Sequence, residues 1–186
     1  MTAPAGPVLG IDAGLRDRTV LEHAVLHALE HIGCPPLLLC THVVSTKGTH
    51  YAASVEFAPG TPLHAPAAAL AGLGAAVAGL GDTPGEYLPG ALAARAAHLV
   101  RDGGRAVRFP GQELLRGRLT VAEVLATGAV QYVHPVGTAV SAETVVETWD
   151  FVRPIFRDGA LVLDVTPAAG GTVIPMELEH QHICGH

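Results

Sequence analysis

The sequence is poor in aromatic residues and in lysine, and it has no excess of positive charge. Aromatic residues make up 4% of its 186 residues, and Lys47 is the single lysine beside ten arginines. Seventeen acidic residues give a formal net charge of −6. A general nucleic-acid-binding protein relies on a broad basic surface, which this balance does not supply. We therefore expect no nucleic-acid partner.

Long apolar runs and a disulfide framework are also lacking. The longest uncharged run of small residues, 65–81, is too short and too rich in Gly and Ala for a membrane span. The first residues, MTAPAGPVLGIDAG, lack the basic segment and apolar core of a secretory signal. Cys34, Cys40 and Cys184 are odd in number and have no framework spacing. We expect a soluble cytoplasmic protein with no membrane partner.

The patterns that are present predict one α+β domain over residues 1–186. Hydrophobic residues make up 49% of the chain, enough to form a core. Apolar residues at helical spacing predict a helix over 19–32, and residues 37–57 resemble a hairpin around Lys47-Gly48. We expect a single layer of mostly antiparallel sheet with a few helices packed on one face. Residues 59–86 form a Pro/Gly/Ala-rich connecting region, and 180–186 form a His/Cys-rich tail.

The expected hairpin and a later helix also predict which side chains are buried. If Thr46 pairs with Thr49, one hairpin face carries His42 with most of the apolar residues and is the buried one. The solvated face then carries His50, Ser54 and Glu56. In the helix expected over 89–101, the side chains predicted to point inward are Leu92, Ala96, Leu99 and Val100, and His98 is expected to be exposed.

Three histidines at a spacing of four stand out in the helix expected over 19–32. Residues four apart lie about 6 Å from each other on a helix, so two imidazoles can share one metal ion. His23 and His31 are separated by about 12 Å of helix rise, so all three cannot bind one ion. The stripe of His23, His27 and His31 is therefore one adjacent pair completed by ligands from the sheet or the tail, or a polar face with no ion.

Five residues of this helix resemble a known motif. His27-Ala28-Leu29-Glu30-His31 is similar to the H-x-x-E-H order of the inverted zinc metalloproteases. The resemblance implies that His27 and His31 hold zinc and that Glu30 is the general base that activates water. It covers five residues of 186, and the third zinc ligand of that family has no clear counterpart here.

The C-terminal tail concentrates further metal ligands. His180, His182, Cys184 and His186 lie within seven residues. If the strand expected before them continues, the first three point to the same face. Such ligands suit Zn, Cu or Ni. The alternative is a frayed terminus with adventitious metal affinity. His42 is a further candidate ligand, for which a satisfied core histidine is the alternative.

These observations leave three functional hypotheses open. The first is a metal-dependent enzyme that uses a Zn or Fe ion, with Ni or Cu as other candidates, on a small-molecule substrate. The second is a metal-trafficking or storage protein that binds through the tail. The third is a regulatory or assembly module without metal, and a homo-oligomer is compatible with each. One stretch of the sequence is rich in arginine. These residues would bind an anionic substrate or form an ordinary solvated surface: Arg95, Arg101, Arg105, Arg108, Arg116 and Arg118.

Overall fold

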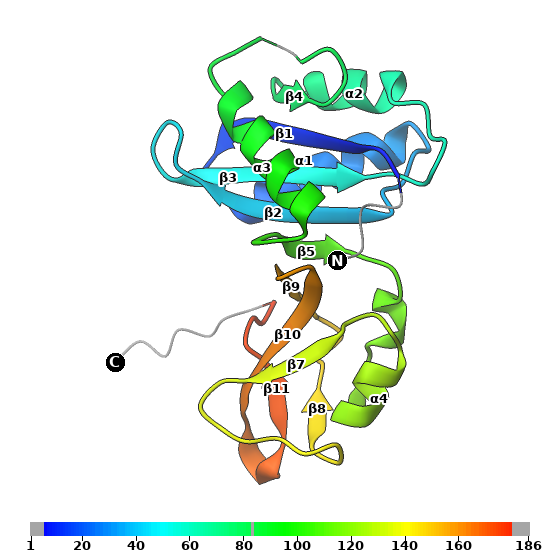
Figure 1. Cartoon of the computed structure of the whole chain (residues 1–186), viewed down its shortest axis with the longest axis vertical. Coiled ribbons are helices and arrows are strands. Elements are labelled where there is room, and N and C mark those ends of the chain that lie inside the picture. The colour runs from blue at the N-terminus through cyan, green and yellow to red at the C-terminus, as the bar shows by residue number, and fades with distance from the viewer. Residues whose placement is uncertain (1–5, 83, 180–186) are drawn as a thin grey trace. The chain divides into compact units, whose positions relative to one another are not determined.

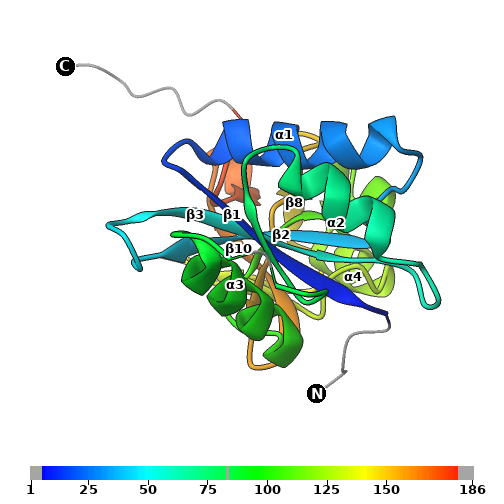
Figure 2. The same ribbon diagram turned by 90° about the horizontal axis from the view of Figure 1, so that it is seen from above.

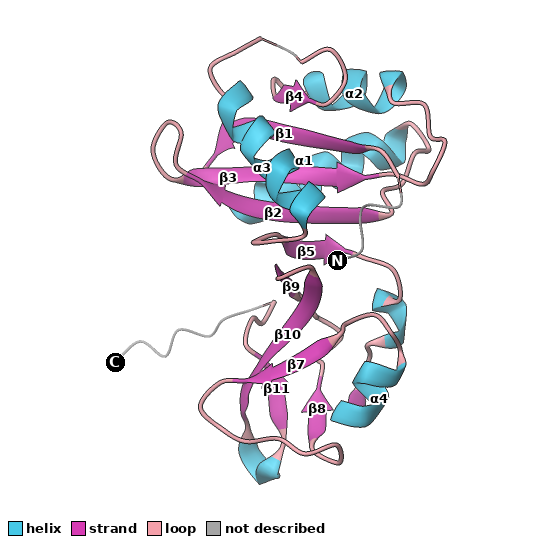
Figure 3. Ribbon diagram, viewed as in Figure 1, coloured by secondary structure: helices cyan, strands magenta, loops and turns pink. Residues whose placement is uncertain are grey.

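The chain is mixed α/β, with a mostly antiparallel arrangement of strands. The computed structural model describes residues 6–82 and 84–179, which contain eleven strands and four α-helices (Figure 3). Contacts divide the chain into two compact units, 1–109 and 110–186. The expectation of a single folding domain stays a prediction. Among the described residues, no helix is both long and apolar enough to cross a membrane.

The first unit is built on one antiparallel sheet (Figure 1). Its strands follow the order β4-β1-β3-β2-β5, and every neighbouring pair is antiparallel. Their bounds are β1 Val8–Leu15, β2 Leu38–Val44, β3 His50–Glu56, β4 Ala76–Ala78 and β5 Arg105–Arg108. The predicted hairpin is therefore β2–β3, at the centre of the sheet.

Helices cover both faces of this sheet. Helices α1 (Arg18–His31) and α2 (His64–Ala71) lie on one face, and α3 (Leu88–Val100) lies on the other (Figure 2). The structure thus differs from the prediction of helices on one face. The segment 59–86, predicted as a connecting region, contributes α2 and β4 to the fold.

Helix α1 forms for the reasons that its sequence indicates. The Asp17 side chain accepts a hydrogen bond from the backbone N–H of Val20 and caps the first turn. Leu21, Val25 and Leu29 follow at helical spacing and are completely or almost completely buried. Each such side chain contributes about 1.5–3 kcal/mol by leaving water. They pack with apolar residues of the sheet and of α2, among them Leu9, Ile11, Leu39, Val55, Phe57 and Leu70.

The pairing of β2 with β3 differs by one residue from the predicted register. The observed partners include Cys40 with Ser54 and His42 with Ala52. Because side chains alternate between faces, a shift of one residue moves a whole strand's side chains to the opposite face. Ser54 and Glu56 therefore share a face with Cys40 and His42, and all four are buried. The prediction that β3 exposes its polar residues is wrong, because α3 covers them.

Helix α3 faces the sheet with small and polar residues. Its buried positions are Gly90, Ala91, Ala94 and His98. The predicted inward residues Leu92, Leu99 and Val100 are instead 42%, 37% and 53% exposed. The prediction is wrong because polar side chains of β3 need polar partners from the covering helix, and His98 supplies one.

Residues 110–179, the described part of the second unit, contain six strands and one α-helix. Strand β10 (Ala160–Pro167) pairs antiparallel with β9 (Ile155–Arg157) and β11 (Val173–Pro175), and parallel with β7 (Tyr132–Pro135). Strand β8 (Val145–Glu147) joins β11 in parallel and β6 (Arg118–Thr120) in antiparallel pairing. Two sequence signals are confirmed. Thr120 and Glu123 form a capping box for α4 (Val121–Ala126), and Asp158-Gly159 turns the β9–β10 hairpin.

Candidate functional site

The histidine stripe of α1 lies on the solvent side of the helix. His23, His27 and His31 are all exposed, opposite the buried leucines and valine. The rings of His27 and His31 are stacked, with centroids 6.4 Å apart and planes 13° from parallel. The two imidazoles are thus neighbours on successive turns, as a shared ion requires.

The end of the helix adds a favourable field for a cation. His31 is the last residue of α1, and Ile32 caps the helix with a backbone N–H bond to the carbonyl of Glu30. The last carbonyl groups of a helix carry a partial negative charge, which stabilises positive charge near them. An ion between His27 and His31 would lie in this last turn and a half.

Glu30 lies in the same turn but has a partner of its own. Its carboxylate is 3.7 Å from the guanidinium of Arg108 on β5, and both side chains are more than half exposed. An exposed pair of this kind contributes little to stability.

His42 is separated from the α1 histidines by the sheet. It lies on the face that α3 covers, whereas α1 packs on the opposite face. Its Nε2 atom is 2.7 Å from the Ser54 hydroxyl, so it is a satisfied core histidine. In this structure His42 and the helix histidines therefore lie on opposite faces of the sheet, and a site shared by them stays a prediction. The other proposed ligands, His180, His182, Cys184 and His186, lie outside the described residues.

Over 6–82 and 84–179, no group of three or more His, Cys, Asp or Glu side chains is placed to hold an ion. The α1 histidines therefore offer two adjacent ligands.

The main polar cluster of the first unit lies beneath α3. The Ser54 hydroxyl is 2.7 Å from His42 Nε2 and 2.7 Å from His98 Nδ1. His98 Nε2 is 3.1 Å from the carboxylate of Glu56, which also accepts a 2.5 Å bond from Arg101 Nη2. The exposed fractions are 0% for Ser54 and 1% for Glu56 and His98, so water does not reach this chain of hydrogen bonds.

The two contacts of His98 Nε2 require different protonation of that nitrogen. The Glu56 carboxylate accepts a bond if Nε2 carries the proton, whereas Arg101 Nη1, 3.0 Å away, donates to Nε2 if it does not. In the first case the Ser54 hydroxyl donates to His98 Nδ1 and accepts from His42 Nε2–H, and in the second case both of these bonds run in the opposite direction. Both rings are neutral in either arrangement. Consistently, burial lowers the pKa of His42 to about 3, and burial together with Arg101 lowers that of His98 against the opposing effect of Glu56.

Arg101 and Cys40 complete the cluster. Arg101 follows the last residue of α3 in a left-handed conformation, with φ 56° and ψ 49°. This conformation costs a non-glycine residue roughly 1–2 kcal/mol. The ion pair with Glu56 offsets that cost, because an uncompensated buried carboxylate is more expensive still. Burial raises the pKa of the Cys40 thiol to about 12, which keeps it protonated and unreactive.

A second buried pair lies at the other end of α3. His50 Nε2 is 2.9 Å from Asp12 Oδ2, and His50 Nδ1 is 2.9 Å from the carbonyl of Gly48. The Tyr87 ring packs edge-on against His50, with centroids 5.6 Å apart. Burial lowers the pKa of His50, but the bonds to Asp12 and Gly48 outweigh it and the net shift is upward.

Most arginines of the arginine-rich stretch bond to acidic side chains or backbone carbonyls of the fold. Arg105 is buried and bonds to the equally buried Glu22 of α1 at 2.5 Å. The Nε atom of Arg95 donates to the carbonyl of Val8. Arg118 lies 3.5 Å from Glu147 in the second unit. These contacts stabilise the fold and do not converge on a shared anion.

The polar cluster was not predicted from the sequence, because Ser54, Glu56 and His98 were placed on solvated surfaces. Ser54, Glu56 and His98 combine a hydroxyl, a carboxylate and an imidazole, the groups of nucleophilic catalysis. Their burial assigns them to the core rather than to a substrate. A signal for it was present, since His98 and Arg101 are three residues apart in a helix with few other polar residues.

Comparison of the chain with protein-family models, with curated proteins and with solved structures gave no match. The functional argument therefore depends on the residues of the chain itself.

Proposed function

We propose that this chain reversibly binds a divalent transition metal ion through His27 and His31, and that it captures metal rather than catalysing a reaction. The observation that carries the proposal is the exposed, stacked pair of imidazoles, 6.4 Å apart on the last turns of α1.

The chemistry of the pair suits ions of the Zn, Ni and Cu class. Neutral imidazole nitrogen binds these ions at about 2.0–2.1 Å, and small rotations of two neighbouring rings direct one nitrogen of each toward a common point. The side chains are exposed, so no buried contact opposes these rotations. The negative end of the helix dipole favours the bound charge.

Two protein ligands leave positions open, which favours reversible binding over a closed structural site. His23 lies one turn earlier and offers a second, overlapping pair with His27. The tail residues 180–186 remain the ligands that the sequence proposes for the open positions. Such a surface can pass an ion to a partner with more ligands.

The enzymatic form of the hypothesis has less support. It requires Glu30 to face metal-bound water and accept its proton, and the Glu30 carboxylate instead lies 3.7 Å from the Arg108 guanidinium. We therefore favour metal capture over catalysis as the function.

Calorimetric titration of untagged protein with Zn, Ni and Cu salts tests the proposal. We expect His27→Ala/His31→Ala to weaken binding at least tenfold, about 1.4 kcal/mol. His64→Ala, which removes an exposed histidine from α2, is the matched control and should bind as the wild type does.

A variant truncated after residue 179 separates the helix from the tail. The proposal requires that the truncated chain still binds metal and loses it when His27 and His31 are replaced. Wild-type protein without metal affinity, or binding abolished by the truncation alone, would contradict it.

A further inference from the structure

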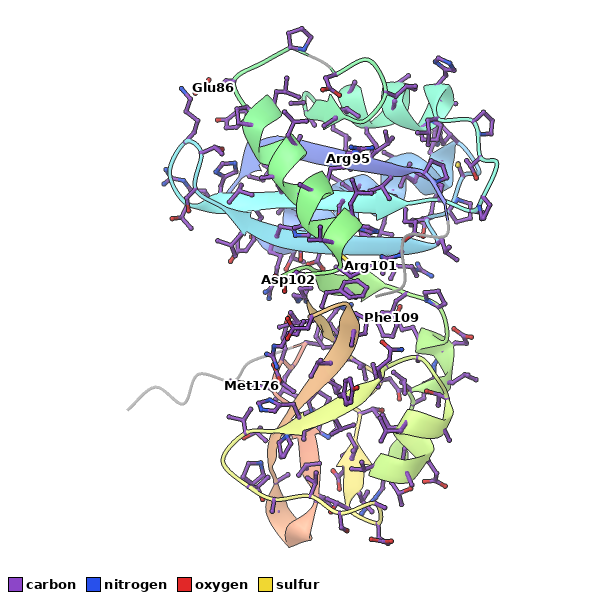
Figure 4. All side chains as sticks on the ribbon, viewed as in Figure 1. Glu86, Arg95, Arg101, Asp102, Phe109 and Met176 are labelled. Carbon is purple, nitrogen blue, oxygen red and sulfur yellow. The ribbon has the colours of Figure 1, made fainter. Side chains whose placement is uncertain are left out.

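Two buried histidines lie at opposite ends of α3, and their surroundings differ in kind. Glu86 and Arg101 mark these two ends in Figure 4. At the Arg101 end, His98 belongs to the polar cluster in which both imidazoles are neutral. At the Glu86 end, His50 is 3% exposed and bonds both to β1 and to the turn 45–49 that joins β2 to β3.

Both ring nitrogens of His50 face atoms that accept hydrogen bonds. Nε2 lies 2.9 Å from Oδ2 and 3.1 Å from Oδ1 of the Asp12 carboxylate, and Nδ1 lies 2.9 Å from the carbonyl oxygen of Gly48. A neutral imidazole carries one N–H and can satisfy one of these two groups, whereas the imidazolium ion carries two and satisfies both. The contacts therefore require one proton more than a neutral imidazole beside a carboxylate would hold.

The groups around His50 decide whether this extra proton is retained. Burial of the ring lowers the pKa of His50, and the nearby charge of Arg16 lowers it further. The bonds to Asp12 and Gly48 act in the opposite direction and outweigh both effects, so the net shift is upward from 6.5. The Asp12 carboxylate is completely buried and is held in place by a bond from the backbone N–H of Gly14.

The Gly48 carbonyl belongs to the exposed turn between β2 and β3, so His50 links this turn to the buried carboxylate of β1. In the same turn Lys47 lies 3.4 Å from Glu86, but both side chains are more than half exposed and such a pair contributes little. Tyr87 covers the His50 ring from the side of α3, with an edge-on contact and centroids 5.6 Å apart. The bond between His50 and Gly48 is thus the stronger attachment of the turn.

We propose that the His50–Asp12 pair is a proton-dependent latch, which holds the turn 45–49 against β1 while His50 is protonated and releases the turn when that proton passes to solvent. Asp12 retains the Nε2 proton of the neutral ring, because a charged acceptor makes the stronger bond. Nδ1 then presents a lone pair to the Gly48 carbonyl 2.9 Å away, and the two repel each other. The turn is the part that yields, because it is exposed and its carbonyl can bond to water instead.

Nitrogen-15 NMR of the full chain in EDTA tests the protonation of His50, and His50→Gln assigns its signals. The chelator removes metal from the exposed histidines, so the result does not depend on the proposed metal capture. We expect both ring nitrogens to be protonated at pH 6, and only Nε2 to remain protonated above the folded pKa, which should lie above 6.5. A His50 ring that is neutral at pH 6, or a neutral form with its proton on Nδ1, would overturn the proposal.

The release of the turn can be measured at one peptide bond. Lys47 is the single lysine of the chain, so a lysine-specific protease cleaves within this turn and nowhere else. When opening and closing are fast, the cleavage rate reports the population of the released turn. Dividing it by the rate for a peptide of residues 43–52 removes the pH dependence of the protease. This ratio should rise above pH 6.5 by up to tenfold per pH unit and level off at the folded pKa of His50.

Two variants separate the latch from general effects of pH. His50→Gln cannot take up a proton, so its ratio should be high and independent of pH between 6 and 8.5. His64→Gln, at an exposed histidine of α2, is the matched control and should follow the wild type. A wild-type ratio that does not change with pH would overturn the proposal, as would a folded His50→Gln variant that keeps the pH dependence. If that variant does not fold, the NMR titration and the cleavage profile of the wild type still decide.

Discussion

The hydroxyl of Ser54 lies 2.7 Å from Nδ1 of His98 and joins the central strand β3 to helix α3. Both residues are shielded from water, with exposed fractions of 0% and 1%. A buried polar group that loses its partner costs about 1–3 kcal/mol, because water cannot replace the lost bond. This contact therefore fixes how α3 sits on the sheet.

Replacing Ser54 by Ala should destabilise the first unit by about 2–4 kcal/mol. The hydroxyl serves two imidazoles, and its removal leaves both His42 Nε2 and His98 Nδ1 without this bond. Urea unfolding followed by circular dichroism measures the change. Ser45→Ala, at an exposed position, is the control and should lie within about 0.5 kcal/mol of the wild type. Equal stability of the two variants would contradict the role of Ser54.

The low pKa values of His42 and His98 predict a loss of stability in acid. Above pH 6.5 these rings are neutral in both the folded and the unfolded chain. As the pH falls below 6.5 the unfolded chain binds protons that the folded chain does not, so the free energy of unfolding decreases. Each proton that the unfolded chain binds and the folded chain does not contributes a slope of about 1.4 kcal/mol per pH unit. For His42 the effect extends down to its folded pKa of about 3.

His42→Gln isolates this effect, because the amide keeps a hydrogen-bonding group near Ser54 but does not titrate. Urea unfolding at a series of pH values between 6.5 and 4.5 should show a slope reduced by about 1.4 kcal/mol per pH unit. His50 has a raised pKa and acts in a different window, since its contribution is complete below pH 6.5 and is lost as the pH rises through its folded value. An unchanged acid slope in the Gln variant would show that His42 is protonated when folded.

The sequence predicted the elements of the hairpin but not its pairing. The turn around Lys47-Gly48 and both strands were correct, whereas pairing Thr46 with Thr49 displaced the register by one residue. The apolar pattern could not decide the register, because this central sheet is buried on both faces and either choice buries apolar residues. Because of this error of one residue, Ser54 and Glu56 were predicted to face solvent, and the polar cluster was not predicted.

The exposure of the two candidate metal ligands was easier to predict from the sequence. The exposure of His27 and His31 follows from the position of Leu21, Val25 and Leu29 on the same helix, which is local information. The orientation of α3 was not predictable in this way. Its leucines form a normal apolar face, and only the polar residues of a strand distant in sequence cause it to turn outward.

Gly10→Ala should lower the free energy of unfolding by more than about 3 kcal/mol. The added Cβ would lie 2.0 Å from the carbonyl oxygen of Ala91, a backbone atom that can move only if α3 moves. Gly33→Ala is a matched control, since Gly33 has φ 65° but open space around it. It should cost only about 1 kcal/mol from backbone strain. Urea unfolding of both variants compares the two costs, and a mild effect of Gly10→Ala would contradict the close packing of α3 on β1.

Trp149→Asn should stabilise the second unit by about 0.5–1 kcal/mol. Trp149 and Asp150 occupy the centre of a tight turn with φ 51° and 55°, a conformation that Asn tolerates far better than Trp. The turn is closed by a bond from the Phe151 N–H to the Thr148 carbonyl.

The bond from the Gly117 N–H to the Asp150 carboxylate also holds the turn, and the Asn variant keeps it. Trp149 is 60% exposed, so little buried contact is lost. Thermal and urea unfolding by circular dichroism measure the gain. Trp149→Ala separates conformation from size, because Ala removes the ring but retains the unfavourable φ. If Ala stabilises the unit as much as Asn does, the exposed ring and not the backbone is the source of the instability.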